Sequence, residues 1–272
     1  MHLVFFLTLM LRSTFLFLHG IGEATEQRLW DEGIDTWQTF LARDFVPGIS
    51  MARKTQYDEE IRTAIHQFES CNSRYFAKCL KARDHWRLFP TFRSKTAYLD
   101  IETTGDPADR GEVTLVGIYG GGKMTTLIQG DSLTEPRLKK ELEKYDLLVT
   151  FFGSGFDLPY LRLHYPSVTY DHPHFDLCLA ARRLGFKGGL KSIEHQLDLS
   201  RSSRLDGLTG WDAVLLWRSW QSGDTEAGTI LLQYNEADTK NLEPLAEILY
   251  EGLVRHSGFR NRSPRSNKEA CY

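Results

Sequence analysis

The chain has 272 residues, of which 41% are hydrophobic, 12% aromatic and 25% charged. This composition is ordinary for a soluble globular protein, and the length suits one large domain or one domain with a small accessory domain. A core of normal size needs no disulfides for its stability. The net charge of −3 gives no overall electrostatic reason to expect nucleic-acid binding. Such binding would need a local basic patch, or metal ions that offset a carboxylate cluster.

The N-terminus begins with an apolar run from Leu3 to Leu11. The run is shorter than the roughly 20 apolar residues of a membrane helix. Only His2 precedes it, whereas a signal peptide carries positive charge at that point. We expect either that translation begins at Met10 or that the run is a buried strand or helix, and a signal peptide is the least favoured alternative.

Residues 10–90 are expected to be helical. An amphipathic stretch covers Ala24–Asp31, and a second helix begins near Asp35 after the break at Gly33. Apolar residues recur at helical spacing between Arg53 and Lys81, which predicts one or two further helices. Cysteines have no Cys-x-x-Cys pair and no zinc-finger spacing, so we expect reduced thiols in a cytoplasmic protein. They are Cys71, Cys79, Cys178 and Cys271.

The pattern changes after Lys95, where strand-like segments begin. Ala97–Ile101 is a predicted buried strand, and two β-rich segments are joined by three glycines at a hairpin turn. Further strands and helices then alternate, which predicts an α/β domain with a mixed β-sheet flanked by helices. The chain after His256 is polar and basic, and we expect it to be disordered. The remaining predicted elements are strands over Glu112–Tyr119, Lys123–Gln129 and Leu147–Phe152, and helices over Thr134–Tyr145, Leu158–His164, Phe175–Leu184, Leu190–Leu197 and Trp211–Arg255, the last broken near Ser222-Gly223.

Two acidic residues on the first predicted strand raise an electrostatic problem. Asp100 and Glu102 are two positions apart, so their side chains point to the same face of the strand. Two carboxylates on one face of an otherwise apolar strand repel each other and are costly to remove from water. A bound cation resolves that conflict, whereas a pair that simply faces solvent is the plainer alternative.

Other acidic residues and one tyrosine extend this pattern. Asp157 follows the Leu147–Phe152 strand at the start of a helix, where it would otherwise act as an N-cap. Tyr234 and Asp238 are four apart and share a helix face, which is otherwise an ordinary exposed face. Hard divalent ions such as Mg²⁺ or Mn²⁺ prefer carboxylate oxygens, and two of them can hold an attacking water and a leaving alkoxide at a phosphate.

The order Asp-x-Glu, Phe-Asp, Tyr-x-x-x-Asp resembles the DEDD exonuclease superfamily in its tyrosine subtype. Here these motifs are Asp100-Ile101-Glu102, Phe156-Asp157 and Tyr234-Asn235-Glu236-Ala237-Asp238. The chain is most similar to the YprB-like branch of ribonuclease-H-like predicted exonucleases, over roughly residues 95–250. The resemblance implies a small helical region at 10–90, a ribonuclease-H-like exonuclease domain at 95–255 and a disordered basic tail at 256–272.

The resemblance also implies roles for the site residues. Asp100 would bridge two metal ions, Glu102 and Asp238 would hold the ion that activates water, and Asp157 would support the second ion. Tyr234 would orient the water. The family often has an Asn a few residues before Phe-Asp, and this chain has none there, which puts substrate positioning more in doubt than metal binding.

Three further features have two interpretations each. Leu18–Thr25 resembles the glycine turn of a helix-hairpin-helix motif, whose backbone N–H groups bind a DNA phosphate, or it is a plain N-terminal turn. Asp176 is either a helix N-cap or a support of the site. Basic residues form either a phosphate-binding surface or a solvated helix face, and they are Arg182, Arg183, Lys187 and Lys191.

These patterns together predict a metal-dependent nuclease. The expected activity is 3′–5′ exonucleolytic hydrolysis of phosphodiester bonds at single-stranded ends of DNA or RNA, with two divalent cations, Mg²⁺ or Mn²⁺, and no membrane association. One alternative is a non-catalytic nucleic-acid-binding module on a nuclease fold. Another is a structure-specific endonuclease of the same clan. The choice between DNA and RNA stays open.

Overall fold

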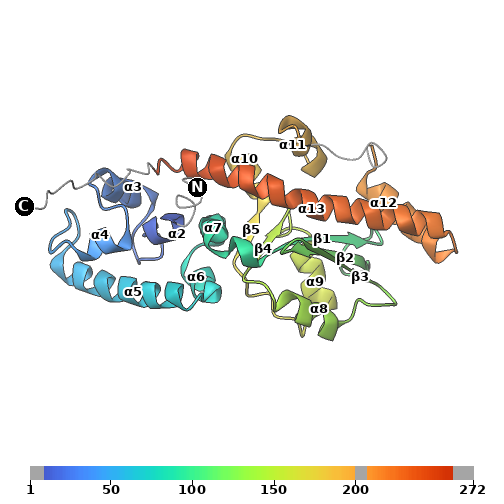
Figure 1. Ribbon diagram of the computed structural model, residues 1–272, viewed down its shortest axis with the longest axis horizontal. Helices are drawn as coiled ribbons and strands as arrows, with labels where there is room; N and C mark the ends of the chain where they lie inside the picture. The colour runs from blue at the N-terminus through green and yellow to red at the C-terminus, as the bar shows by residue number, and fades with distance from the viewer. Residues whose placement is uncertain (1–8, 200–206, 260–272) are drawn as a thin grey trace, which may run out of the picture.

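The computed structural model describes residues 9–199 and 207–259. Most of the N-terminal apolar run and most of the expected basic tail lie outside these residues. The described chain begins with the helical region that the sequence predicts (Figure 1). Side-chain caps at Thr36, Ser50 and Asn72 start three of its helices. The elements are α2 (Leu9–Ser13), α3 (Glu23–Asp31), α4 (Trp37–Leu41), α5 (Met51–Glu69), α6 (Ser73–Cys79), the 3-10 helix η1 (Ala82–Leu88), α7 (Phe89–Phe92) and the 3-10 helix η2 (Arg93–Lys95).

A five-stranded mixed sheet follows, as expected. Its strand order is β3-β2-β1-β4-β5. The first three strands pair antiparallel, whereas β4 and β5 run parallel to β1. Gly121 and Gly122 both have positive φ, 58° and 75°, as a tight hairpin between β2 and β3 requires. The strands are β1 (Thr96–Thr103), β2 (Val113–Gly120), β3 (Lys123–Ile128), β4 (Leu147–Thr150) and β5 (His174–Asp176).

The prediction of a helix over Phe175–Leu184 is wrong at its N-terminal end, where the chain forms the edge strand β5. Phe175 lies in β5 and pairs with Val149 of β4. The helix α10 (Leu177–Arg183) begins only after Asp176, which is its N-cap. A three-residue strand is too short to show alternation, and its pairing with β4 is a long-range contact. Likewise, the predicted strand Leu147–Phe152 ends at Thr150.

The side chains of β1 divide the core into two layers. Ala97, Leu99 and Ile101 pack in one apolar cluster with α8 (Glu135–Leu142) and α9 (Asp157–His164). Tyr98 faces the opposite side, in a cluster with residues of α10 and α13 (Thr225–His256). Figure 1 shows α8 and α9 below the sheet, and α10, α11 (Leu190–Gln196), α12 (Gly210–Gln221) and α13 above it.

The helix α13 has 32 residues and runs along both parts of the molecule (Figure 1). Its first half packs on β1 and β2, next to α12. Its second half contributes Leu245, Leu249 and Leu253 to a cluster that also contains Leu29 and Trp86 of the N-terminal region. The break predicted near Ser222-Gly223 separates α12 from α13, and Gly223 has a φ of 102° there.

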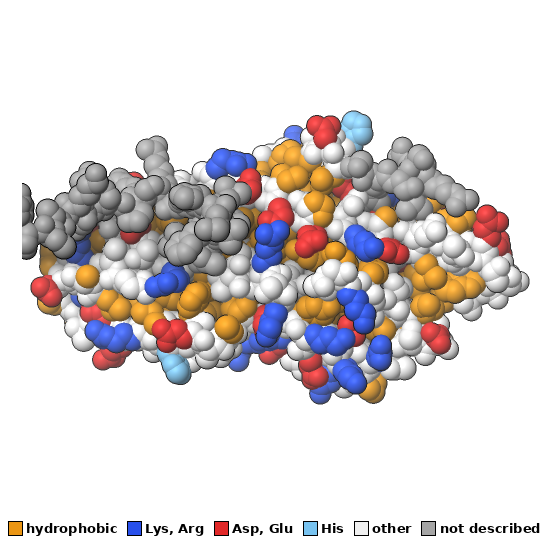
Figure 2. All heavy atoms as spheres, viewed as in Figure 1, with side chains coloured by type: hydrophobic (Ala, Val, Ile, Leu, Met, Phe, Trp, Pro, Cys, Tyr) orange, Lys and Arg blue, Asp and Glu red, His pale blue; other side chains and the backbone are white. Residues whose placement is uncertain are grey.

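The surface shown in Figure 2 carries mixed charges, and Lys and Arg side chains gather over the region of α8. Lys139 in α8 and Lys144 just after it pair with Glu143 and Glu141. This patch is therefore a solvated helix face, and it lies on the side of the sheet away from α13. None of the helices in the described part of the chain is long and apolar enough to cross a membrane.

Candidate functional site

A cavity of about 580 Å³ opens beside the C-terminal half of β1. Four of the five residues that the sequence singled out line it, namely Asp100, Glu102, Tyr234 and Asp238. They come from two elements, β1 and α13, that are separated by more than a hundred residues in the chain. Further walls are formed by Thr103, Gly105, Asp106, Pro107, Phe156, Tyr160, Gly210, Trp211 and Val214, together with Ile101.

Strand register explains how α13 comes close to Asp100. Asp100 pairs with Gly117 of β2, so the two positions share one face of the sheet. A Cβ atom at Gly117 would lie 2.3 Å from Oδ1 of Asn235 and 2.4 Å from Oγ1 of Thr239. Only glycine leaves room for these two α13 side chains, and the helix consequently lies directly against the strand that carries the carboxylates.

Asn235 connects α13 to Asp100. Its Nδ2 donates a hydrogen bond of 3.0 Å to Oδ2 of Asp100. The side chain is fully buried, and its Oδ1 atom has no hydrogen-bond partner among the described residues. The same amide lowers the pKa of both Asp100 and Glu102, against the larger effects that raise them. Sequence analysis did not single out Asn235, although it stands inside the Tyr-x-x-x-Asp motif.

The electrostatics of the two β1 carboxylates are unfavourable. Burial raises the pKa of Asp100 well above its usual range, and the neighbouring charges of Glu102, Asp238 and Asp157 raise it further. Burial, followed by the charge of Asp238, raises the pKa of Glu102 to about 8. Both effects disfavour the charged form, so a proton or a cation is needed to hold these groups together.

Asp157 lies next to this cavity without lining it. It is the first residue of α9 and is buried, with 3% of its surface exposed. Its Oδ1 accepts a hydrogen bond of 3.2 Å from the backbone N–H of Ile101, between the two β1 carboxylates. Phe156 occupies the N-cap position of α9, so the carboxylate of Asp157 is directed to β1 instead. Burial raises its pKa to about 7.

A lysine from α11 reaches the same site. Lys191 Nζ donates a hydrogen bond of 3.1 Å to the phenolic oxygen of Tyr234, and it lies 4.5 Å from the centroid of that ring. Its charge also lowers the pKa of Glu102. The sequence had offered Lys191 only as part of a phosphate-binding surface or of a solvated helix face.

The position of Lys191 is set by the way α11 docks on α13. Ile193 and Glu194 are buried, at 0% and 1% exposure. Oε1 of Glu194 accepts a hydrogen bond of 3.0 Å from Nδ2 of Asn241 in α13. Because these two anchors lie within one helical turn of Lys191, the ammonium group is held over Tyr234 by the same helix pair that carries Asp238.

Asp176 is the N-cap of α10, as one of its two interpretations predicts, and its role as a support of the site stays a prediction. Its carboxylate caps α10 by accepting from the backbone N–H groups of Cys178 and Leu179. It also accepts from the backbone N–H groups of Phe152 and Ser154, each at 3.0 Å, and from the Ser154 hydroxyl. It therefore fixes the loop between β4 and α9, which leads directly to Asp157.

The donor chemistry of the site suits divalent cations. Within residues 9–199 and 207–259, no group of three or more His, Cys, Asp or Glu side chains already forms a metal-holding arrangement. Asp100, Glu102, Asp157 and Asp238 nevertheless supply the hard oxygen donors that Mg²⁺ and Mn²⁺ prefer. Their mutual repulsion, seen in the raised pKa of Asp100, is what a bound cation relieves. The residues thus fit a divalent cation by their chemistry, although not as a preformed cage.

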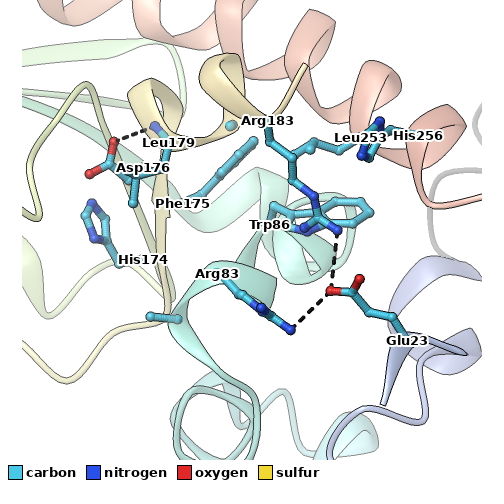
Figure 3. Close-up of a pocket in the computed structure, with 12 residues that line it drawn as sticks. Glu23, Arg83, Trp86, His174, Phe175, Asp176, Leu179, Arg183, Leu253 and His256 are labelled. Atoms are coloured by element: carbon cyan, nitrogen blue, oxygen red, sulfur yellow. Dashed lines mark hydrogen bonds and ion pairs between the residues drawn. The ribbon is translucent and has the colours of Figure 1, made fainter. Parts of the chain in front are cut away.

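A second cavity, of about 340 Å³, lies at the junction with the N-terminal region (Figure 3). Glu23, in the first turn of α3, forms ion pairs with Arg83 at 3.2 Å and with Arg183 at 3.6 Å. Gly20 and Gly22, which precede α3, are exposed. The first residue of α3 thus carries a carboxylate that is paired with two arginines.

Several solved structures are similar to this chain. The chain is similar to a family B DNA polymerase from the hyperthermophilic archaeon Pyrobaculum calidifontis, with 16% identity over 60% of this chain and 25% of the polymerase, and a TM-score of 0.48. It is similar to a nuclease in its apo form, with 21% identity over 65% of this chain and 79% of that chain, and a TM-score of 0.46. It is also similar to Brucella melitensis NrnC bound to pGG, with 21% identity over 65% and 92% and a TM-score of 0.35.

A search of curated proteins finds no match for this chain. One family model, described as the RNase_H superfamily, matches residues 97–250. That match begins at the strand that carries Asp100 and ends within α13, beyond Asp238. Because the match covers more than half of the chain and includes the whole sheet, this protein belongs to the RNase_H superfamily.

Proposed function

We propose that this protein is a metal-dependent nuclease that acts as a 3′–5′ exonuclease on single-stranded ends of DNA or RNA. One observation carries this proposal: Asp100, Glu102, Asp238 and Tyr234 line a single cavity. The buried carboxylates raise one another's pKa, which is the state of a site built to neutralise its charge with cations. The carboxylates would hold the ions, in the donor set that hard divalent cations prefer.

Under this proposal, each residue of the site has a separate role. Asp100 would contact both ions, and Asp157, at the start of α9, would support one of them. Glu102 and Asp238 would hold the other ion, beside the attacking water. When bound, two such ions supply the positive charge that activates water and stabilises the leaving oxygen. Tyr234 would orient the water through its hydroxyl, which Lys191 already contacts at 3.1 Å.

The exonuclease is favoured over the two alternatives by specific residues. A non-catalytic module would have no reason to retain buried carboxylates that repel one another, since apolar residues in their place are more stable. A structure-specific endonuclease would not need a tyrosine among the carboxylates, whereas Tyr234 is buried within the cavity wall at 4% exposure. The YprB-like branch is the subtype that we propose on the motifs Asp100-Ile101-Glu102 and Tyr234 to Asp238.

The activity is tested with single-stranded oligonucleotides, DNA and RNA of matched sequence, labelled at either end. With Mn²⁺ or Mg²⁺, we expect the 5′-labelled strand to shorten progressively and the 3′-labelled strand to release its label at once. Asp100→Asn removes one negative charge without changing the size of the side chain, and it should abolish both signals. Equal degradation by the wild type and by Asp100→Asn would show contamination and refute the proposal.

Two further measurements separate the alternatives. Titration calorimetry with Mn²⁺ should detect binding that is lost in Asp100→Asn, and an absence of binding would favour the non-catalytic module. Oligonucleotides blocked at both ends should resist the enzyme, whereas an endonuclease would cut them internally. Together the two outcomes identify which of the three functions is correct.

We also propose that the turn at Gly20-Ile21-Gly22 contacts a nucleic-acid phosphate, as its resemblance to a helix-hairpin-helix turn implies. Glu23, the first residue of α3, would then oppose a phosphate at the turn through its negative charge. Glu23→Gln should increase affinity for duplex DNA under this proposal. An unchanged affinity would leave the turn as an ordinary helix start.

A further inference from the structure

Phe152 has a backbone conformation that aromatic residues rarely adopt. Its φ is +64°, in the left-handed region that glycine and asparagine tolerate and a bulky residue avoids. The backbone is held there from both sides. Its N–H donates to Oδ1 of Asp176 at 3.0 Å, and its carbonyl oxygen accepts from the N–H groups of Gly155 and Phe156, at 3.0 and 3.1 Å. Asp176 itself lies beside the second cavity (Figure 3).

Burial does not explain this strained residue. The side chain of Phe152 is 42% exposed, and it belongs to none of the apolar clusters of the described core, whereas its neighbour Phe151 packs against one of them. Backbone strain that side-chain packing does not offset is characteristic of residues that take part in binding or catalysis.

The phenyl ring is held in a defined place on the surface. A Cβ atom at Gly155 would lie 2.5 Å from Cζ of Phe152, so the ring rests against the backbone at Gly155. The guanidinium carbon of Arg182, from α10, lies 5.8 Å from the centroid of the ring. Arg182 is exposed. The exposed ring of Phe152 and the guanidinium group of Arg182 therefore lie side by side on the surface.

This surface continues into the carboxylate site. The loop runs from Phe152 to Phe156, whose side chain is 38% exposed and lines the cavity with Asp100 and Glu102. Asp157 follows directly. Unpaired bases stack on exposed aromatic rings without regard to sequence, and arginine adds attraction to the bases and to the phosphate backbone. The chemistry of the ring and its cation therefore matches an unpaired nucleotide in a strand that enters the site.

We propose that Phe152 and Arg182 form a stacking site for one unpaired base of a single-stranded nucleic acid, adjacent to the carboxylate cavity. The nature of this ligand rests on the nuclease function proposed above. Asp176 positions the ring through the backbone of Phe152, and Arg182 lies beside it. The site recognises the flat face of a base, so DNA and RNA strands both satisfy its chemistry.

Binding is measured in the Asp100→Asn background, so that the full chain holds its strand without cleaving it. The probes are oligothymidylate and oligouridylate that carry one 2-aminopurine at successive positions from the 3′ end. The fluorescence of this base falls when it stacks. We expect one position to be quenched in both strands, and Phe152→Ala to remove that quenching and to weaken binding roughly ten-fold. A strand preference would show that the sugar is also recognised.

The variants separate stacking from a general loss of structure. Phe152→Trp keeps an aromatic ring and should retain the affinity, whereas Phe152→Asn relieves the strained φ and should lose affinity without a lower Tm. Arg182→Ala should weaken binding less than Phe152→Ala does. Phe45→Ala is the matched control, because Phe45 is 63% exposed and belongs to the N-terminal region. Wild-type affinity and quenching in Phe152→Ala and Phe152→Asn would overturn the stacking site.

A base-free substrate distinguishes this failure from a failure of the proposed nuclease. A 5′-labelled oligomer of abasic tetrahydrofuran nucleotides with Mn²⁺ needs the carboxylates and offers no flat ring to stack. In the otherwise wild-type chain, Phe152→Ala should hydrolyse it at the normal rate, whereas Asp100→Asn should not. Quenching at Phe152 in a protein that hydrolyses neither substrate would retain the stacking site and reject the nuclease.

Discussion

The ammonium group of Lys191 donates a hydrogen bond to the phenolic oxygen of Tyr234 across 3.1 Å, and it lies over the same ring at 4.5 Å. The two residues come from different helices, α11 and α13, and their separation along the chain is 43 positions. The contact fixes the direction of the hydroxyl group. If Tyr234 orients the attacking water, Lys191 acts as its positioning residue.

Lys191→Ala should therefore lower the turnover number about ten-fold, since a charge-assisted hydrogen bond contributes roughly 1.5–3 kcal/mol. KM should change less, because the effect passes through Tyr234. The double variant with Tyr234→Phe should be no slower than Tyr234→Phe alone, which is the signature of two groups that act as a unit. Lys187→Ala, at an exposed position in the preceding loop, is the control. Multiplicative effects in the double variant would show that Lys191 acts independently of the tyrosine.

The pH dependence of stability should reveal the carboxylates. Burial raises the pKa of Glu102 to about 8 and that of Asp157 to about 7. Between pH 6.5 and 8.5 the folded protein thus holds protons that the unfolded chain has already released, and its free energy of unfolding must fall as the pH rises. Buried histidines with a lowered pKa, such as His174 at about 4, have the opposite effect, which fades above pH 6.5 as the histidines of the unfolded chain lose their protons.

Urea denaturation in EDTA across that window measures the fall. Asp100→Asn should flatten it, because one buried carboxyl whose own pKa is raised no longer titrates. Mn²⁺ should restore stability at pH 8.5 more than at pH 6.5, since cations bind the deprotonated carboxylates. A metal-free protein whose stability rises with pH over this range would contradict the assigned directions.

Gly117→Ala should disturb the site without touching any of its carboxylates. The new methyl group would lie 2.3 Å from Oδ1 of Asn235, so α13 must move away from β2. We expect a loss of about 1–3 kcal/mol of stability from this overpacking, together with reduced activity because Asp238 and Tyr234 move with the helix. Gly189→Ala is the control, since nothing lies within 4 Å of its added atom. Full activity in Gly117→Ala would show that the spacing between α13 and β2 does not control the site.

Asp176→Ala should loosen the loop that leads to Asp157. The carboxylate accepts hydrogen bonds from four backbone N–H groups, as well as from the Ser154 hydroxyl, and the four belong to Phe152, Ser154, Cys178 and Leu179. Their loss should cost about 1–3 kcal/mol and reduce exonuclease activity. Asp224→Ala removes an exposed cap at the start of α13 and should cost about 1 kcal/mol without affecting activity. If the two variants lost activity equally, the loss in Asp176→Ala would be explained by the missing helix cap, and the contacts to the loop would not matter for activity.

The elements that could be predicted from the sequence are those with a strong local pattern. The alternation of β1 places Asp100 and Glu102 on one face, and four-residue spacing places Tyr234 and Asp238 on one turn of α13. The structure brings these four residues to one cavity, and their metal-binding roles stay predictions. The mixed sheet and the helical N-terminal region are confirmed.

The features that the sequence did not reveal depend on contacts between distant segments. In the sequence, Gly117 looks like any strand glycine. Its importance comes from the strand register, which pairs it with Asp100 and places it against Asn235. Lys191 acquires its place only when α11 docks on α13 through Glu194. β5 is too short to carry a pattern of its own. In each case the contact that determines the structure joins residues far apart in the chain, and the periodic pattern of a single helix or strand does not reveal it.

The order of synthesis gives α13 a particular importance. The whole sheet, including Asp100 and Glu102, leaves the ribosome before Tyr234 and Asp238 do, because these residues belong to the last described helix. Domains begin to fold from their N-terminus during translation. A nascent chain of this protein therefore carries three of the four carboxylates, Asp100, Glu102 and Asp157, before α13 supplies Asp238. The carboxylate site proposed for hydrolysis is therefore complete only after α13 has been synthesised.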